Sequence, residues 1–106
     1  MATNSNVFDF IVGQSDFVTV DMIKNLDRSL NTQVISGAVW EVENTGVATY
    51  VSSSAAVDAG GRYISAKFTA VADGVTRIKV TATTTSPTAT IVEYILLRVY
   101  TPPSSL

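Results

Sequence analysis

Apolar and polar residues alternate in short runs along most of the chain, a pattern typical of β-strands with one buried face. In the run 64–70, isoleucine, alanine and phenylalanine take one face, while serine, lysine and threonine take the other. The run 77–82 alternates in the same way, with arginine, lysine and threonine on its polar face. Asp73 and Gly74, between the two runs, form the turn signal of a β-hairpin. This part of the chain therefore predicts two adjoining strands.

Further apolar runs extend the pattern over the whole chain. Five of them are predicted to be strands, at 7–12, 17–22, 38–43, 47–51 and 91–100. The segment 23–30 fits either a helical turn or a loop. About seven β-branched strands, with turn signals every 8–12 residues or so, are typical of an immunoglobulin-like sandwich, and short turns favour antiparallel pairing. The sequence therefore predicts an all-β fold, an immunoglobulin-like antiparallel β-sandwich.

One domain accounts for the whole chain, because 106 residues are enough for one domain and hardly more. We expect residues 1–106 to form this domain, with short tails at 1–6 and 101–106. Trp40, on the third strand, is expected to pack between the two sheets. The inward positions of the strands predict the core residues Trp40, Val42, Ile64, Phe68, Ile78, Val80, Ile95 and Leu97.

The last strand breaks the alternation, because the face opposite Ile95, Leu97 and Val99 is also largely apolar. Either a β-bulge exchanges the two faces midway, or the second face is buried against another chain. The first strand, apolar on both sides of Asp9, is either fully buried or pairs with a neighbouring subunit. The hypothesis of a protein interface names Phe8, Phe10, Tyr94, Leu96, Arg98 and Tyr100.

The composition is poor in charge. Charged residues make up 15% of the chain and hydrophobic residues 46%, and the mean hydropathy is +0.29. An average soluble domain has roughly 25% charged residues. The shortfall indicates either apolar surface covered by partners or a well-filled core. The first alternative predicts a homo-oligomer or another bound protein.

The residues that carry most enzyme chemistry are missing. The chain has no histidine and no cysteine, which removes the commonest general base, thiolate nucleophiles and cysteine zinc sites. No nucleophile elbow, P-loop or dinucleotide-binding fingerprint occurs. Glu41 and Glu43 share a strand face as a glycosidase pair could, but two solvated glutamates are the simpler interpretation. Asp58 and Asp73 lie in glycine-containing turns without a calcium-loop pattern. We expect no catalysis, no cofactor and no metal.

Nucleic acid and membranes are not expected partners. The formal net charge is −2, and no run of lysine or arginine could neutralise a row of phosphates. No stretch approaches the roughly eighteen apolar residues of a membrane span. The start of the chain has neither the basic nor the apolar region of a signal peptide. We therefore expect the protein to be made and to fold in a cytoplasm.

Several segments together resemble a known group of proteins. They are FDFIV at 8–12, SGAVWEV at 36–42, GVA at 46–48, ISAKF at 64–68, ADG at 72–74, IKVTATTT at 78–85 and EYILLRV at 93–99. Spread over most of the chain, they resemble small immunoglobulin-like virion proteins of tailed bacteriophages, the group of fiber–tail adaptors and related head or tail components. The resemblance lies in strands and turns and includes no catalytic signature.

This resemblance implies a non-enzymatic structural component of the virion, made in the host cytoplasm. It would act as an oligomeric adaptor or connector at the tail or head–tail junction, where fibers attach. Its partners would be other virion proteins of the tail, fiber, portal or capsid. Capsid decoration is the next alternative.

A second resemblance implies a different setting. The segment 40–49 resembles bacterial Ig-like group 2 domains, which occur in cell-surface adhesins, and so implies a surface or glycan-binding module. In that group the pattern continues into a strand that begins with glycine, whereas here the small-residue run 52–56 intervenes. A start at Met1 without an export signal favours the virion interpretation.

Overall fold

The computed structural model describes residues 7–22, 26 and 32–101. The strands are β1 (Val7–Ile11), β2 (Ser15–Asp21), β3 (Val34–Val42), β4 (Ala48–Tyr50), β5 (Ala56–Val57), β6 (Tyr63–Ala70), β7 (Gly74–Thr85) and β8 (Ala89–Tyr100). No helix long and apolar enough to span a membrane occurs in these residues. Apart from Leu26 and Thr101, the segment 23–30 and both predicted tails lie outside the described residues, so the choice between helix and loop stays open.

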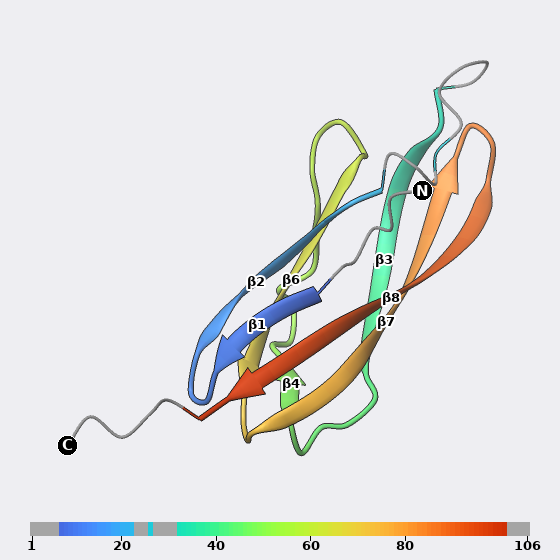
Figure 1. Cartoon of the computed structure of the whole chain (residues 1–106). Coiled ribbons are helices and arrows are strands. Elements are labelled where there is room, and N and C mark those ends of the chain that lie inside the picture. The colour runs from blue at the N-terminus through green and yellow to red at the C-terminus, as the bar shows by residue number, and fades with distance from the viewer. Residues whose placement is uncertain (1–6, 23–25, 27–31, 102–106) are drawn as a thin grey trace.

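The strands form two sheets that pack face to face (Figure 1). Sheet A has the strand order β1-β8-β7-β3, and sheet B has the order β2-β6-β4, with β5 also paired to β6. Every pair of strands is antiparallel except β1 and β8, which run parallel. The arrangement is the immunoglobulin-like sandwich that the sequence predicts.

The parallel pair arises because the chain leaves sheet A directly after β1. The N–H of Val12 donates to the carbonyl of Tyr100 in sheet A at 2.9 Å, whereas the N–H of Gly13 donates to the carbonyl of Ala70 in sheet B at 3.0 Å. Gly13 has a φ of 92°, a conformation that glycine adopts without steric cost. As a result, β2 pairs with β6 instead of β1, and β1 lies along β8.

The turn at Asp73 and Gly74 also connects the two sheets. β6 belongs to sheet B and β7 to sheet A, so the hairpin predicted from these two residues is wrong. The carbonyl of Val47 supports the crossing by accepting hydrogen bonds from the N–H groups of Val71 and Ala72. A turn signal is local, whereas the sheet that the next strand joins depends on the packing of the whole core.

β7 and β8 form the long hairpin of the molecule, with twelve residues in each strand. Their register runs without a shift from the pair Gly74–Val99 to the pair Thr84–Ala89. A bulge therefore does not exchange the faces of β8, and that explanation of its two apolar faces is wrong. The one register shift in sheet A lies in β3, at Ser36.

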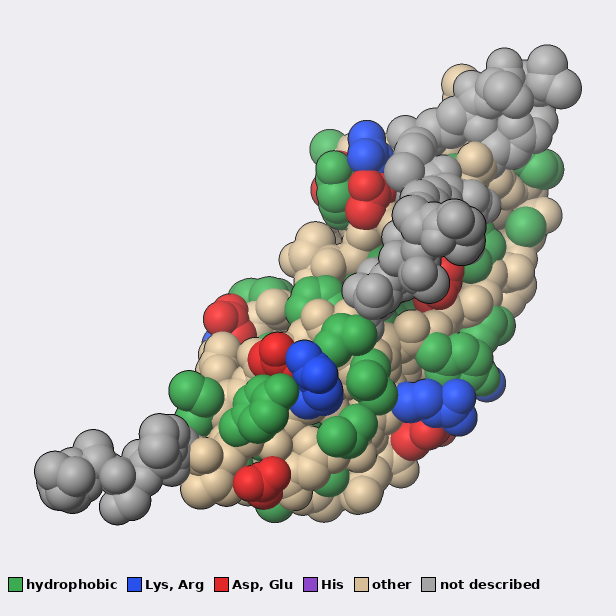
Figure 2. Space-filling view, in the orientation of Figure 1, with side chains coloured by type: hydrophobic (Ala, Val, Ile, Leu, Met, Phe, Trp, Pro, Cys, Tyr) green, Lys and Arg blue, Asp and Glu red, His purple; other side chains and the backbone are tan. Residues whose placement is uncertain are grey.

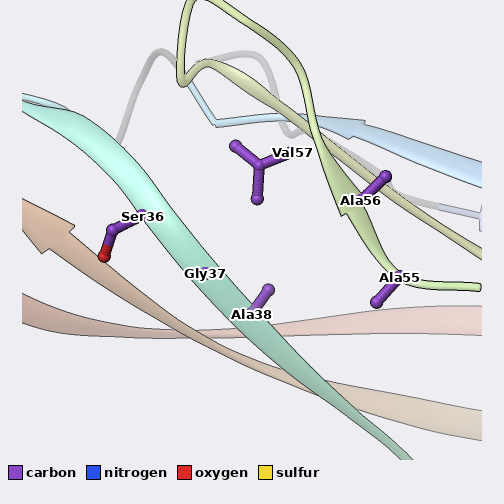
Figure 3. A pocket seen from close by; sticks show the side chains of 6 residues that line it. All are labelled: Ser36, Gly37, Ala38, Ala55, Ala56 and Val57. Atoms are coloured by element: carbon purple, nitrogen blue, oxygen red, sulfur yellow. The ribbon is translucent and has the colours of Figure 1, made fainter. Parts of the chain in front are cut away.

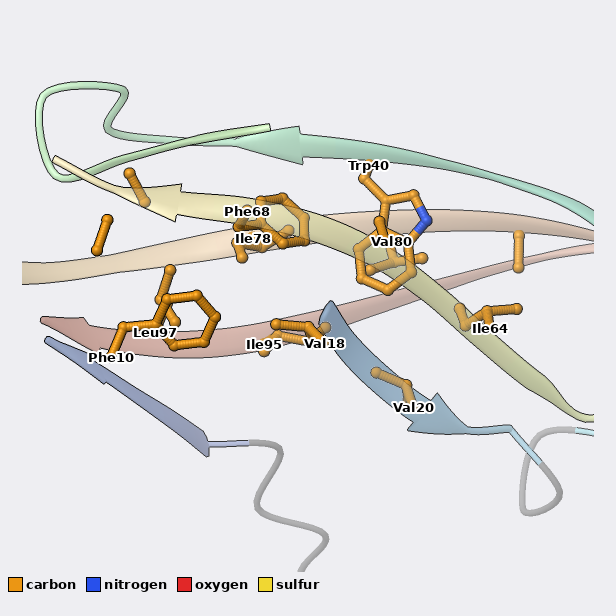
Figure 4. Packing of buried hydrophobic residues seen from close by; sticks show 14 of the residues in the cluster. Phe10, Val18, Val20, Trp40, Ile64, Phe68, Ile78, Val80, Ile95 and Leu97 are labelled. Carbon is orange, nitrogen blue, oxygen red and sulfur yellow. The ribbon is translucent and has the colours of Figure 1, made fainter. Parts of the chain in front are cut away.

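The inner faces of the two sheets fill the core with apolar side chains (Figure 4). The rings of Trp40 and Phe68 lie 5.7 Å apart, and the ring of Tyr50 lies 5.8 Å from Phe68. Trp40 comes from sheet A and Phe68 from sheet B, so aromatic contacts join the two sheets. Val42 is partly buried against this cluster. The other predicted core residues are at most 6% exposed: Trp40, Ile64, Phe68, Ile78, Val80, Ile95 and Leu97.

Candidate interaction surface

The outer face of sheet A carries many apolar side chains, most of which come from β1, β7 and β8. We call the following seven residues the apolar patch: Val7, Ile11, Val75, Val92, Tyr94, Leu96 and Tyr100. Val75 is 55% exposed, and Tyr94 and Tyr100 are each 46% exposed. Figure 2 shows hydrophobic side chains gathered around a few charged ones on this face. Single exposed apolar residues are ordinary, but a contiguous group of them indicates an interaction site.

Strand pairing places the members of the apolar patch next to one another. In the parallel pair of β1 and β8, Val7 lies opposite Leu96, and Ile11 lies opposite Tyr100. On the other side of β8, the register places Val75 of β7 next to the outward residues of β8. Because neighbouring strands lie about 4.8 Å apart, the apolar patch is continuous across three strands.

Two ion pairs lie within the apolar patch. Nε and Nη2 of Arg98 donate to the two carboxylate oxygens of Asp9 at 2.7 and 3.0 Å. Arg77 binds Glu43 in the same way at 3.0 Å, and its guanidinium lies 4.7 Å from the centre of the Tyr94 ring. The hydrogen bond from Arg98 lowers the pKa of Asp9. Since these four charges are compensated within the chain, a partner that covers this face need not supply counter-charges for them.

The outer face of sheet B is polar by comparison. Phe17 and Tyr63 are its exposed rings, and each lies beside a cation, with Lys67 Nζ 5.8 Å from the first ring centre and Arg62 Cζ 4.9 Å from the second. Hydroxyl residues take five more of the outward positions: Ser15, Thr19, Thr49, Ser65 and Thr69. The difference between the two outer faces places the candidate interaction surface on sheet A.

The structure divides the six predicted interface residues between two faces. Four of them face outward on β8: Tyr94, Leu96, Arg98 and Tyr100. Phe10 is only 5% exposed and belongs to the core, and Phe8, partly buried, packs against the core from the same strand face. The prediction that Phe10 lies at an interface is therefore wrong, and Phe8 lies on the core side of β1 with it. The physical reason is that β1 turns Asp9 outward, where it pairs with Arg98.

Four residues of the apolar patch are missing from the predicted interface: Val7, Ile11, Val75 and Val92. Val7 and Ile11 alternate with the two phenylalanines, so the sequence pattern does place them on the opposite face of the first strand. It does not show that this face continues that of β8, because Asp9 and its partner Arg98 are 89 positions apart. Val75 precedes the run recognised as its strand, and its neighbours depend on the same long-range pairing.

The aspartates considered as calcium ligands hold turns in place. Oδ1 of Asp58 accepts hydrogen bonds from the N–H groups of Arg62 and Tyr63, both at 2.8 Å. Oδ2 of Asp73 accepts hydrogen bonds from the N–H and the hydroxyl of Thr101, at 3.2 and 2.8 Å. Nowhere in the described ranges do three or more carboxylate, histidine or cysteine side chains come together as metal ligands.

A hollow of about 240 Å³ opens between β3 and β5 (Figure 3). Small side chains and backbone line it: Ser36, Gly37, Ala38, Ala55, Ala56 and Val57. The Ser36 hydroxyl, the one polar side chain in this lining, donates to the carbonyl of Thr83 at 3.2 Å. The lining offers no charged group that could orient a small ligand.

Comparison with known proteins finds similarity of structure, since no family model and no curated protein matches the sequence. The S-layer protein rSbsC(31-844) superposes with a TM-score of 0.61 and 17% identity, over 94% of this chain and 12% of that one. SbsC domains 5-6 superpose with a TM-score of 0.61 and 16% identity, over 95% of this chain and 43% of that one. SbsC domains 4 and 5 superpose with a TM-score of 0.57 and 18% identity, over 92% of this chain and 43% of that one. This chain spans less than half the length of each, and at such low identity the likeness establishes only the fold, the immunoglobulin-like β-sandwich.

Proposed function

We propose that this chain is a non-enzymatic structural module that is built into an ordered protein assembly through the apolar patch on sheet A. The observation that carries the proposal is the concentration of exposed apolar side chains on one outer face, where the neighbouring charges are already paired. The polar outer face of sheet B is the internal contrast, because both faces belong to the same small domain. A face of this kind suits a contact with protein.

The size of the face supports the same function. A twelve-residue strand is about 40 Å long, and four strands are about 19 Å wide, so the outer face of sheet A covers at most about 750 Å². A standard protein interface takes roughly 800 Å² from each partner. One contact through this face is therefore of ordinary size, and repetition of that contact by symmetry would give a stable attachment.

The setting that we propose first is the virion of a tailed bacteriophage. The segments that resemble small phage virion proteins include EYILLRV at 93–99, which supplies Tyr94, Leu96 and Arg98 to the outer face of β8. In this setting the chain acts as an oligomeric adaptor or connector at the tail or head–tail junction. Capsid decoration uses the same kind of contact at a higher copy number.

The second candidate setting is a cell-surface layer. It is supported by the similarity to domains of SbsC, which is named as an S-layer protein, and by the resemblance of the segment 40–49 to surface-adhesin domains. Because this chain spans less than half of those SbsC chains, it would act as one module of a larger surface protein.

Quantitative mass spectrometry of fractions from the source tests these settings. Gradient-purified particles and the washed cell envelope are compared, with the major capsid protein as the internal standard for the particles. A few copies per particle support an adaptor or connector, and near-capsid abundance supports decoration. Enrichment in the envelope alone supports the surface layer. Absence from both fractions contradicts the proposed function.

A further inference from the structure

The free edge of β3 carries backbone hydrogen-bonding groups that the described part of the chain does not use. β3 pairs with β7 on one side only, and the N–H of Glu43 donates to the carbonyl of Arg77 at 3.0 Å. In an antiparallel pair, alternate residues point their N–H and C=O groups toward the partner strand, and the others point away from it. Counting back from Glu43, the residues whose backbone groups point away from β7 are Ala38, Trp40 and Val42.

This edge lacks the usual protection against strand pairing. β3 contains neither lysine nor proline, and its single charged residue is Glu41. Val39, at 69%, is more exposed than any other large apolar side chain in the described residues. Exposed edge strands with few charges are templates for pairing with another chain. By contrast, β1 is only five residues long and has Asp9 at its centre.

The open part of the edge has clear limits. At its start, the N–H of Ile35 donates to the carbonyl of Gly61 at 2.8 Å, and the bulge at Ser36 follows. At its end, Asn44 turns the chain and its N–H donates to the Thr76 hydroxyl at 2.9 Å. Beside the first residue of the stretch 38–42, the hollow separates β3 from β5 (Figure 3).

We propose that β3 pairs antiparallel with β3 of a second copy of this chain, about a two-fold axis at Trp40. In this register Trp40 lies opposite Trp40 of the second copy, and Ala38 lies opposite its Val42. The three residues of each copy whose backbone groups point away from β7 then lie opposite one another, so every free N–H and C=O of the stretch 38–42 gains a partner. The two copies of sheet A become one sheet of eight strands.

The charges favour this register over its neighbours. A shift of the two-fold axis to Glu41 would place two glutamates directly opposite each other, which is unfavourable. A shift to Val39 would bring the bulged Ser36 into the pairing and lose part of the ladder. In the proposed register Glu41 lies opposite Val39 of the second copy. On its other side, Glu41 lies opposite Lys79 of β7. The occupant with this complementarity is a second copy of the chain.

Sedimentation of the purified chain over a range of concentrations, with the variant Ala38→Pro, tests the pairing. The N–H of Ala38 points away from β7, so proline removes a donor of the free edge without removing a bond of the ladder. We expect the wild-type chain to dimerise and Ala38→Pro to weaken the dimer at least about tenfold. Thr90→Lys, at an exposed position of the same sheet outside the apolar patch, is the matched control and should leave the dimer intact. A dimer that persists in Ala38→Pro, whether or not Leu96→Lys removes it, would overturn the inference.

Amide hydrogen exchange of the wild-type chain tests the pairing without any substitution. As concentration rises, the amides of Ala38, Trp40 and Val42 should become protected, while those of Val39 and Glu41, which face β7, should exchange slowly throughout. A chain that stays monomeric up to about 1 mM, beyond the range of most specific contacts, overturns the inference, as does a dimer in which these three amides gain no protection. Neither result depends on whether the chain belongs to a virion or a cell surface.

Discussion

At the scale of single residues, Gly61 holds the loop after β5 against the start of β3. Its φ is +66°, and a Cβ at this position would lie 2.5 Å from Cβ of Val34. We expect Gly61→Ala to lower the free energy of unfolding by about 2 kcal/mol or more, through backbone strain and the clash. Urea denaturation followed by circular dichroism measures it. Gly37→Ala is the control, because its nearest contact is an ordinary 3.7 Å and its φ is not positive. Equal losses in the two variants would contradict this role of Gly61.

The pair of Asp9 and Arg98 predicts a specific pH dependence. The hydrogen bond from Arg98 lowers the pKa of Asp9 in the folded protein. The stability that this shift contributes is therefore present above the unfolded pKa of about 4 and is lost as pH falls through the lower folded value. We expect Asp9→Asn to be less stable than the wild type at pH 7, and the difference to shrink progressively as the pH falls below about 4. Denaturation curves measured across this pH range check the prediction; a difference independent of pH would contradict it.

At the scale of elements, the two faces of β8 have different roles. Leu97 is fully buried between the sheets, whereas Leu96 lies on the outer face, partly exposed. We expect Leu97→Ala to cost about 2–5 kcal/mol of stability and Leu96→Ala about 1 kcal/mol or less. Thermal and urea unfolding of the two single variants, which remove the same atoms, give the comparison. The reverse order would mean that the faces of β8 are assigned wrongly.

The sequence alone predicts where some strands lie but not how the strands pair. Alternation is sufficient to find β6 and β7, because a strand with one buried face repeats every two residues. It is not sufficient to find which strands adjoin: Asp73 and Gly74 carry a hairpin signal, yet they connect two sheets. The parallel pairing of β1 with β8 is likewise a property of the packed core. Phe10 shows the consequence, because an apolar residue on a terminal strand looks the same in sequence whether it faces the core or a partner.

At the scale of the whole molecule, the low charge content of the chain reflects apolar residues in two places. Part of the apolar content fills the core, and part lies exposed on the outer face of sheet A. Composition alone favours neither explanation over the other. The residues that make up the candidate surface could be predicted only for β8, since Val7, Ile11 and Val75 join it through contacts between strands distant in sequence.

We propose that the outer face of sheet A is the surface through which the chain is built into its assembly. The most direct measurement is a competition during assembly, in which isotopically labelled wild-type chain and an unlabelled variant are produced together. Their ratio in the purified assembly is then determined by mass spectrometry. Leu96→Lys is the test variant. Thr90→Lys is its control, because Thr90 is an exposed residue of the same strand outside the apolar patch.

We expect Leu96→Lys to be depleted at least about tenfold relative to the wild type, since a lysine at the centre of an apolar contact must be desolvated. Thr90→Lys should be incorporated at nearly the wild-type ratio. If a folded Leu96→Lys chain enters the assembly as readily as the wild type, the outer face of sheet A is not the assembly surface.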